Sequence, residues 1–136
     1  MKILRAIPLF AVVWVIYNLI VVTGSGETLQ ATVFGMDLIK THWTMNLGEL
    51  LIVLGLLALF IEIVKSTRTT MSSVLDHSLS TLVFIAFLVE FITVPGAGNS
   101  IFFVLALMSL MDVMTGFTVT ILAARRDLSV AENVNV

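Results

Sequence analysis

The sequence contains no cysteine and little charge. None of its 136 residues is a cysteine, and only 12% are Asp, Glu, Lys or Arg. The absence of cysteine excludes disulfides, thiolate metal sites and haem attachment through a Cys-x-x-Cys-His motif. The sequence also lacks a basic patch interleaved with aromatic residues, so we expect no nucleic-acid partner.

What replaces the charge is hydrophobic residues. They make up 59% of the chain, and the mean hydropathy is +1.11. A soluble domain averages about 45–50% apolar and about 25% charged residues. A soluble fold of this size could not bury so much apolar surface. We therefore predict one compact membrane domain that covers residues 1–136 and has the lipid bilayer as its main solvent.

Four apolar stretches are long enough to cross a bilayer, whose hydrocarbon core of about 30 Å needs about 20 helical residues. They are residues 3–22, 43–64, 73–94 and 99–124. Irregular backbone is costly in lipid, so each stretch should be helical throughout. The first resembles a signal peptide, but the weak cleavage site that follows it favours a retained helix. The predicted fold is an all-α polytopic membrane protein, a four-helix antiparallel bundle.

The basic residues predict the orientation. All but one flank the same side of the predicted spans: Lys2, Arg5, Lys65, Arg68, Arg125 and Arg126. Only Lys40 falls on the other side. By the positive-inside rule, both termini and the 65–72 loop should be cytoplasmic. The 23–42 loop and the 95–98 turn should then be external.

The external loop, residues 23–42, allows two structures. Residues 32–36 could form a strand that pairs with a return strand near 42–44. The loop could equally form a helix in the membrane interface, capped by Ser25 with Glu27 in its first turn. In either form it should pack on the outer end of the bundle.

The other links carry helix-end signals. Ser73-Val74-Leu75-Asp76 fits a capping box that would start the third helix. Pro95 and Gly96 should end that helix, and Asn99 or Ser100 can cap the fourth. Because the 95–98 connection is so short, the third and fourth helices should form a tight antiparallel hairpin.

Three carboxylates lie inside the predicted spans with no Lys or Arg at their depth: Glu49, Glu90 and Asp112. A charged side chain at a helix centre costs about 2.5–3.5 kcal/mol on insertion scales. From a rise of about 1.5 Å per residue, Glu49 and Glu90 lie about 8–9 Å outward of the span centres. Asn18 falls at a similar level, and Asp112 lies near the middle of its span.

Two functions fit these acids. They could form a funnel that binds protons or cations, since acid in excess of base favours a cation or a retained proton. Alternatively, they could be protonated and bonded to neighbours, gluing helices at about 0.6–2 kcal/mol per bond. The second interpretation is favoured. In it, Glu49 and Glu90 form an outer pair on adjacent helices near Asn18, and Asp112 stands apart.

Helices two and four carry stripes of small residues that permit close helix approach. The stripe on the fourth helix should face inward with Asp112: Ser109, Asp112, Gly116, Thr120 and Ala123. The opposite face suits lipid or a neighbouring subunit: Phe103, Leu107, Leu110, Met114, Phe117 and Ile121. Helix two has Gly48, Gly55 and Glu62 at heptad spacing, a line that could meet another helix of the chain or another protomer.

The cytoplasmic end gathers charged residues: Arg5, Glu62, Lys65, Arg68, Asp76, His77, Arg125, Arg126 and Asp127. This cluster could bind lipid phosphate or a partner. Local ion pairs that accompany the positive-inside rule are the favoured interpretation. The two histidines, His42 and His77, fall at opposite membrane faces and cannot ligate one haem within a chain. We expect no metal, no cofactor and no catalytic constellation, so the chain should not be an enzyme.

Several segments together resemble a known group of proteins. They are Trp43 to Arg68, ending in Phe60-Ile61-Glu62-Ile63-Val64-Lys65-Ser66-Thr67-Arg68, then Asp76-His77 to Glu90-Phe91, and Asp112-Val113 with Gly116-Phe117. The chain is similar in these to small four-helix inner-membrane proteins of proteobacteria that carry no assigned function. The resemblance implies the same topology and a bacterial inner membrane. It transfers no activity, substrate or site.

The expected function is that of a non-enzymatic membrane scaffold or accessory subunit. A chain this small rarely encloses a pathway alone, so we expect a homo-oligomer or a subunit of a larger membrane complex. The alternative is a proton or cation channel or transporter that uses the intramembrane carboxylates, with Asn18 as an auxiliary ligand.

Overall fold

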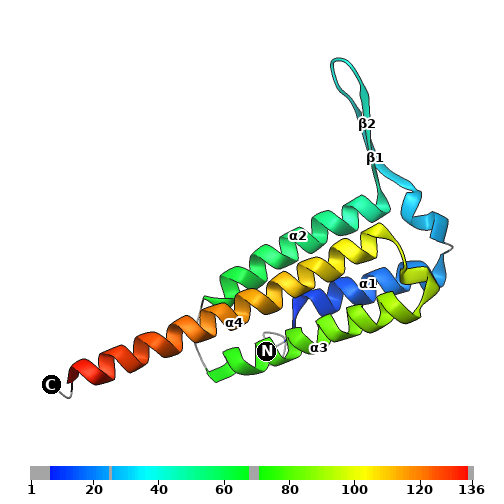
Figure 1. The fold of residues 1–136 in the computed structure, drawn as a ribbon. Coiled ribbons are helices and arrows are strands. Elements are labelled where there is room, and N and C mark those ends of the chain that lie inside the picture. Colours follow the sequence, from blue (N-terminus) through cyan, green and yellow to red (C-terminus); the bar gives the residue numbers. More distant parts are fainter. Residues whose placement is uncertain (1–6, 25, 68–70, 135–136) are drawn as a thin grey trace.

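A computed structural model describes residues 7–24, 26–67 and 71–134 (Figure 1). Within these residues the chain forms four α-helices, one β-hairpin and two short 3-10 helices. The helices are α1 (Leu9–Thr23), α2 (Leu47–Ser66), α3 (Met71–Thr93) and α4 (Ser100–Val134). The hairpin strands are β1 (Thr32–Asp37) and β2 (His42–Asn46), and the 3-10 helices are η2 (Gly26–Gln30) and η3 (Pro95–Ala97).

Three of the helices are long and apolar enough to cross a membrane: Leu47–Ser66, Leu75–Thr93 and Ser100–Arg126. The fourth, α1, is apolar but has only 15 residues, which is about 22 Å of helix. The prediction of four helices is confirmed, and within the described residues three of them, rather than the four predicted, have the length and hydropathy to cross a membrane. The predicted start of the first span, residue 3, lies outside the described residues.

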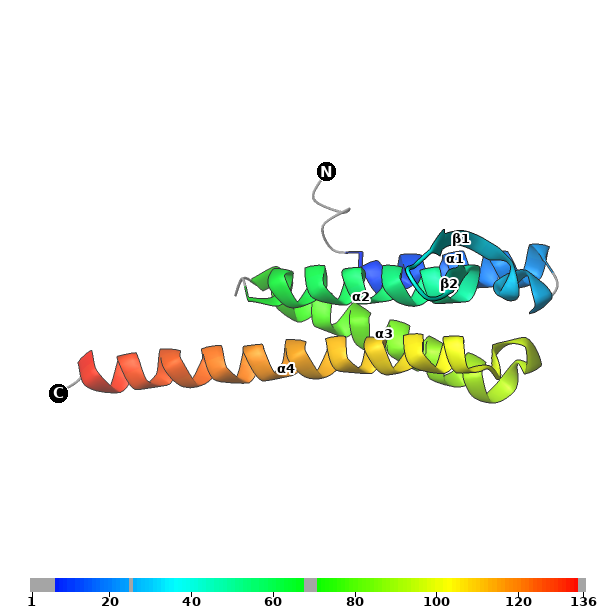
Figure 2. The same cartoon turned by 90° about the horizontal axis from the view of Figure 1, so that it is seen from above.

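The helices pack in the circular order α1, α2, α4, α3, so that α2 and α3 lie across the bundle from each other. α4 is the longest element and extends well beyond its neighbours (Figures 1 and 2). It continues past the predicted end at residue 124, because residues 125–134 contain neither proline nor glycine to stop it. α3 begins at Met71, two residues before the predicted cap Ser73.

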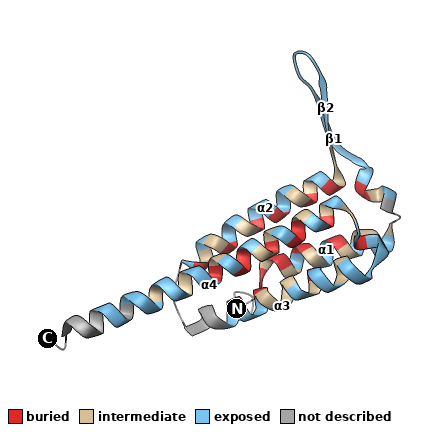
Figure 3. Ribbon diagram, viewed as in Figure 1, coloured by how far each residue is buried: buried red, intermediate tan, exposed pale blue. Residues whose placement is uncertain are grey.

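Aromatic rings fill the centre of the bundle. Tyr17, Phe87 and Phe102 are fully buried, and the Phe102 ring centroid lies 4.7 Å from that of Tyr17 and 5.2 Å from that of Phe87. Burial is confined to the inward faces of the helices, while the outward faces and the hairpin are exposed (Figure 3). The bundle therefore presents an apolar exterior, as a membrane protein does to lipid.

The predicted faces of α4 are confirmed. Ser109, Asp112 and Gly116 are buried, and on the opposite face Met114 and Phe117 are exposed.

The glycine line of α2 contacts α4 of the same chain. A Cβ added at Gly55 would lie 2.7 Å from Cδ2 of Leu105, and one at Gly48 would collide with the Ile101 side chain. Intrachain packing thus accounts for this line.

The external loop takes the strand alternative. β1 and β2 pair antiparallel, and η2 precedes them with Glu27 in its first turn. Because β2 runs to Asn46, α2 begins at Leu47 rather than at residue 43. The expectation that this loop packs on the bundle holds for η2, whose Leu29 is buried in the core. It is wrong for the hairpin, which projects away from the bundle and is exposed almost throughout (Figures 1 and 3).

Candidate functional site

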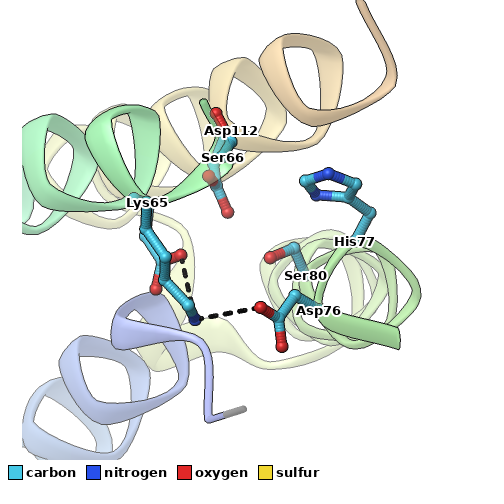
Figure 4. Close-up of a pocket in the computed structure, with 7 residues that line it drawn as sticks. Lys65, Ser66, Asp76, His77, Ser80 and Asp112 are labelled. Atoms are coloured by element: carbon cyan, nitrogen blue, oxygen red, sulfur yellow. Dashed lines mark ion pairs between the residues drawn. The ribbon is translucent and has the colours of Figure 1, made fainter. Parts of the chain in front are cut away.

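Polar side chains from α2, α3 and α4 surround a small cavity near the α2–α3 connection (Figure 4). We call them the Asp112 cluster: Glu62, Lys65, Ser66, Asp76, His77, Ser80 and Asp112. The cavity volume is about 20 Å³. A water molecule needs about 10–15 Å³ on this measure, together with polar partners. The cavity is therefore polar and large enough for about one water or one ion of similar size.

Lys65 is the cationic centre of the cluster. Its Nζ lies 3.6 Å from Oε2 of Glu62 and 3.6 Å from Oδ2 of Asp76 (Figure 4). The second of these contacts joins the last turns of α2 to the first turns of α3. Asp112 lines the same cavity, so the cluster contains three carboxylates and one ammonium group.

Glu62 also ties α1 to α2. The residue is 5% exposed, and its Oε1 accepts the backbone N–H of Leu9 at 2.6 Å. Leu9 begins α1, and the residue before it, Pro8, provides no side-chain cap. The first N–H groups of a helix lack intrahelical partners and carry partial positive charge. The carboxylate of Glu62 therefore acts as a cap supplied by a neighbouring helix.

Asp112 is only partly satisfied. The residue is 6% exposed, and Ser80 forms a side-chain hydrogen bond with its carboxylate. Among the described residues, Oδ2 of Asp112 has no hydrogen-bond partner, and neither do Oδ1 of Asp76 and Oγ of Ser109. A buried polar atom without a partner costs about 1–3 kcal/mol. The cluster therefore holds more acceptor capacity than its own donors fill.

His77 closes one side of the cluster against α4. It is buried, and a Cβ added at Gly116 would lie 2.6 Å from Cε1 of the imidazole. The small residue on α4 thus leaves the space that the ring occupies. The predicted stripe of small residues has this packing role in addition to permitting close helix approach.

A second polar group joins α1 to α3. Oε2 of Glu90 accepts a hydrogen bond from Nε1 of Trp14 at 2.6 Å and another from Nδ2 of Asn18 at 3.1 Å. Asn18 also donates to the carbonyl oxygen of Trp14. The Glu90 carboxylate is therefore held by two neutral donors, and all three side chains are half-buried.

The predicted outer pair of Glu49 and Glu90 does not form. Glu49 is exposed and lies in the first turn of α2, where its Oε2 accepts the Asn46 N–H at 2.9 Å. Oδ1 of Asn46 in turn accepts the Glu49 N–H at 2.8 Å, which completes a capping box. Glu49 lies in the first turn because α2 begins at Leu47 rather than at residue 43. The adjacency was wrong because α2 and α3 lie diagonally.

The neighbours of Asp112 also differ from those expected for a funnel that binds protons or cations. It lies with Glu62, Asp76 and His77, which belong to the predicted cytoplasmic charge cluster. Arg125 is exposed on the free end of α4, while Arg5 and Arg68 lie outside the described residues. The capping box at the start of α2 could be recognised from the sequence, because Asn46-x-x-Glu49 has the spacing of such a box. Trp14 was missed as a partner of Glu90, although it lies one turn from Asn18 on the same face.

Asn99 links the α3–α4 turn to α1. Its Oδ1 accepts the N–H of Phe102 at 3.0 Å, which confirms it as a cap of α4. Its Nδ2 donates to the carbonyl oxygen of Gly96 at 3.0 Å and to the hydroxyl oxygen of Tyr17. The Tyr17 hydroxyl donates to the same carbonyl at 3.1 Å.

No group of three His, Asp or Glu side chains within residues 7–24, 26–67 and 71–134 is arranged to hold a metal ion. Comparison with known proteins returns no matching family, curated protein or solved structure.

Proposed function

We propose that the chain is a non-enzymatic integral membrane scaffold or accessory subunit, which self-associates or joins a larger membrane complex. One observation carries the proposal: the polar side chains inside the bundle bond between helices. Glu90 joins α3 to α1, Glu62 joins α2 to α1, and Lys65 joins α2 to α3. Interhelical bonds of this kind stabilise packing in a membrane. In these bonds the acidic side chains hold helices together.

The apolar exterior supports the same proposal. The outward face of α4 exposes large side chains, among them Phe103, Met114, Phe117 and Ile121. Such a surface suits lipid or another membrane helix. The distribution of Lys and Arg favours cytoplasmic termini, and the resemblance noted above favours a bacterial inner membrane. In that orientation the Asp112 cluster belongs to the cytoplasmic half and the hairpin to the outside.

Native mass spectrometry of the chain extracted in lipid nanodiscs tests the proposal. We expect a defined homo-oligomer, or a stoichiometric complex with a second membrane protein. The variant Phe117→Ala, on the outward face of α4, should weaken an assembly that uses this face. Val113→Ala is the matched control, since Val113 is buried on the same helix. A monomer without a stoichiometric partner would contradict the proposal.

A second candidate function is proton or cation transport through the Asp112 cluster. The cavity of about 20 Å³ and the unpartnered Oδ2 of Asp112 favour it. Purified protein in liposomes, with an imposed pH or K⁺ gradient, separates the two functions. Flux that Asp112→Asn abolishes and Glu49→Gln leaves intact would contradict the scaffold, since Glu49 only caps α2 at its surface. The absence of flux would contradict the transporter.

A further inference from the structure

The hairpin is joined to the bundle without a linker. Asn46 ends β2 and caps α2, and the N–H of Leu47 donates to the carbonyl oxygen of Ala31 at 2.9 Å. The base of both strands is therefore held at the first turn of α2. From there the hairpin runs across the helix axes rather than along them (Figures 1 and 2).

The strand register determines which side chains lie on the same face of the hairpin. Thr32 pairs with Asn46, but the next pairs are Phe34 with Met45 and Met36 with Trp43. The register thus shifts by one residue between Thr32 and Phe34. Without the shift, Phe34 would lie opposite Thr44. A one-residue slip moves every side chain to the other face. The irregularity therefore brings the apolar residues of both strands to one face.

The resulting hairpin is amphipathic. One face carries Phe34, Met36, Trp43 and Met45, with the Phe34 and Trp43 rings edge to face at 6.0 Å between centroids. The other face carries Gly35, Asp37, His42 and Thr44, with a hydrogen bond between the Asp37 carboxylate and the His42 imidazole. A Cβ added at Gly35 would lie 3.3 Å from Nε2 of His42 and 3.5 Å from Cγ2 of Thr44, which places these residues together.

The apolar face is uncovered by the described part of the chain. Phe34 is 51% exposed, Met36 45% and Trp43 41%, and at the tip Leu38 and Ile39 are exposed as well. A two-stranded hairpin alone is marginally stable in water. An exposed apolar patch of this kind marks a protein or membrane contact. The face therefore needs an occupant.

We propose that the occupant is the phospholipid surface of the bilayer that α2, α3 and α4 cross, with the apolar face at the boundary between headgroups and acyl chains. This inference rests on the proposed membrane insertion. α2 has 20 residues, about 30 Å, which matches the hydrocarbon thickness. Its first turn, and with it the base of the hairpin, then lies at the membrane surface.

The direction and chemistry of the hairpin fit this position. If the helices follow the membrane normal, a hairpin that runs across them lies along the surface. Tryptophan is enriched at this depth, and Trp43 lies on the apolar face. Lys40 at the tip is exposed and can meet lipid phosphate, while Asp37 and His42 remain in water.

Single-cysteine labelling tests the inference, and the cysteine-free chain needs no background substitutions. Met36→Cys on the apolar face and Thr44→Cys on the polar face each receive an environment-sensitive fluorophore. Leu82→Cys, on the exposed side of α3, reports insertion. The full chain is reconstituted in vesicles of phosphatidylethanolamine and phosphatidylglycerol, with or without brominated acyl chains. We expect the label at Met36 to be blue-shifted and quenched several-fold more than the label at Thr44.

The three positions separate the outcomes. Quenching at Leu82 with equal, weak quenching at Met36 and Thr44 would overturn the inference and leave the membrane function standing. A label at Met36 that is shielded from water but escapes lipid quenching, together with a disulfide-linked dimer of the unlabelled Met36→Cys variant, would overturn it in favour of self-association. The absence of quenching at Leu82 and Met36 alike would overturn both. Circular dichroism of the three variants checks that the helices are retained.

Discussion

A double-mutant cycle at Trp14 and Glu90 tests whether polar groups hold the helices together. Trp14→Phe removes the indole N–H but keeps an aromatic ring, and Glu90→Met removes the acceptor while keeping the length of the side chain. The bond between these residues is 2.6 Å long and joins α1 to α3. Among the described residues, the bond is one of a small set of polar contacts between α1 and the other helices and turns, so its loss should be visible in the free energy of unfolding.

The expected magnitudes follow from the geometry. Interhelical hydrogen bonds in membranes average about 0.6 kcal/mol and reach about 1.7 kcal/mol, and bonds to charged groups are worth about 1.5–3 kcal/mol. Because the pair is half-buried, we expect a coupling energy of about 1–2 kcal/mol. Glu90→Met should cost more than Trp14→Phe, because Asn18 also loses its acceptor.

The assay is equilibrium unfolding in mixed micelles titrated with sodium dodecyl sulfate, followed by helical circular dichroism. The wild type, both single variants and the double variant complete the cycle. A second cycle, Glu49→Gln with Glu90→Gln, is the control, because Glu49 is hydrogen-bonded to Asn46 at the start of α2. Independent sites add within about 0.3–0.5 kcal/mol. A Trp14–Glu90 coupling no larger than this would refute the role of Glu90 as a helix tie.

Three further predictions concern single sites and use the same unfolding assay. Asn46→Ala should destabilise the protein by about 1 kcal/mol through loss of the α2 cap; an unchanged stability would contradict the capping box. Gly116→Leu should cost at least about 2 kcal/mol because it displaces the buried His77 ring, whereas Gly98→Ala, whose Cβ meets only an ordinary contact at 3.5 Å, should be nearly neutral. Asp112→Asn should stabilise the protein by about 1 kcal/mol, since it removes a buried charge that is only partly paired; destabilisation would instead indicate that the carboxylate holds a bound ion or water.

The helices were predictable because lipid imposes a simple condition on a chain. Apolar runs of about 20 residues predict spanning helices from the local sequence alone, whatever the neighbouring helices are. Faces were predictable for a similar reason, since small residues such as Gly116 recur at helical spacing and large ones such as Phe117 lie opposite. The Asn99 cap could also be predicted, because capping depends only on a few consecutive residues.

The candidate site was predictable only in part. Depth along a helix depends on where the helix begins, and four residues of β2 displaced α2 enough to bring Glu49 to its first turn. Partnership across helices depends on their order in the bundle, which hydropathy does not encode. Their polarity marks Glu62, Asp76 and His77 as candidate site residues. The sequence does not show that they lie around Asp112, as the structure does.

The amino-acid sequence by itself determined that this is a helical chain suited to a membrane, which residues lie on its helices and which acids needed an explanation. These properties are local, since they follow from hydropathy and from spacing along one helix. The tertiary structure alone decided that Glu90 binds Trp14 and Asn18, that Glu62 caps α1, and that a one-residue shift in register makes the hairpin amphipathic. The contacts of Glu90 and Glu62 join segments more than 50 residues apart in the chain. Their geometry follows from how whole helices and strands pack, because each packed element restricts which side chains can meet.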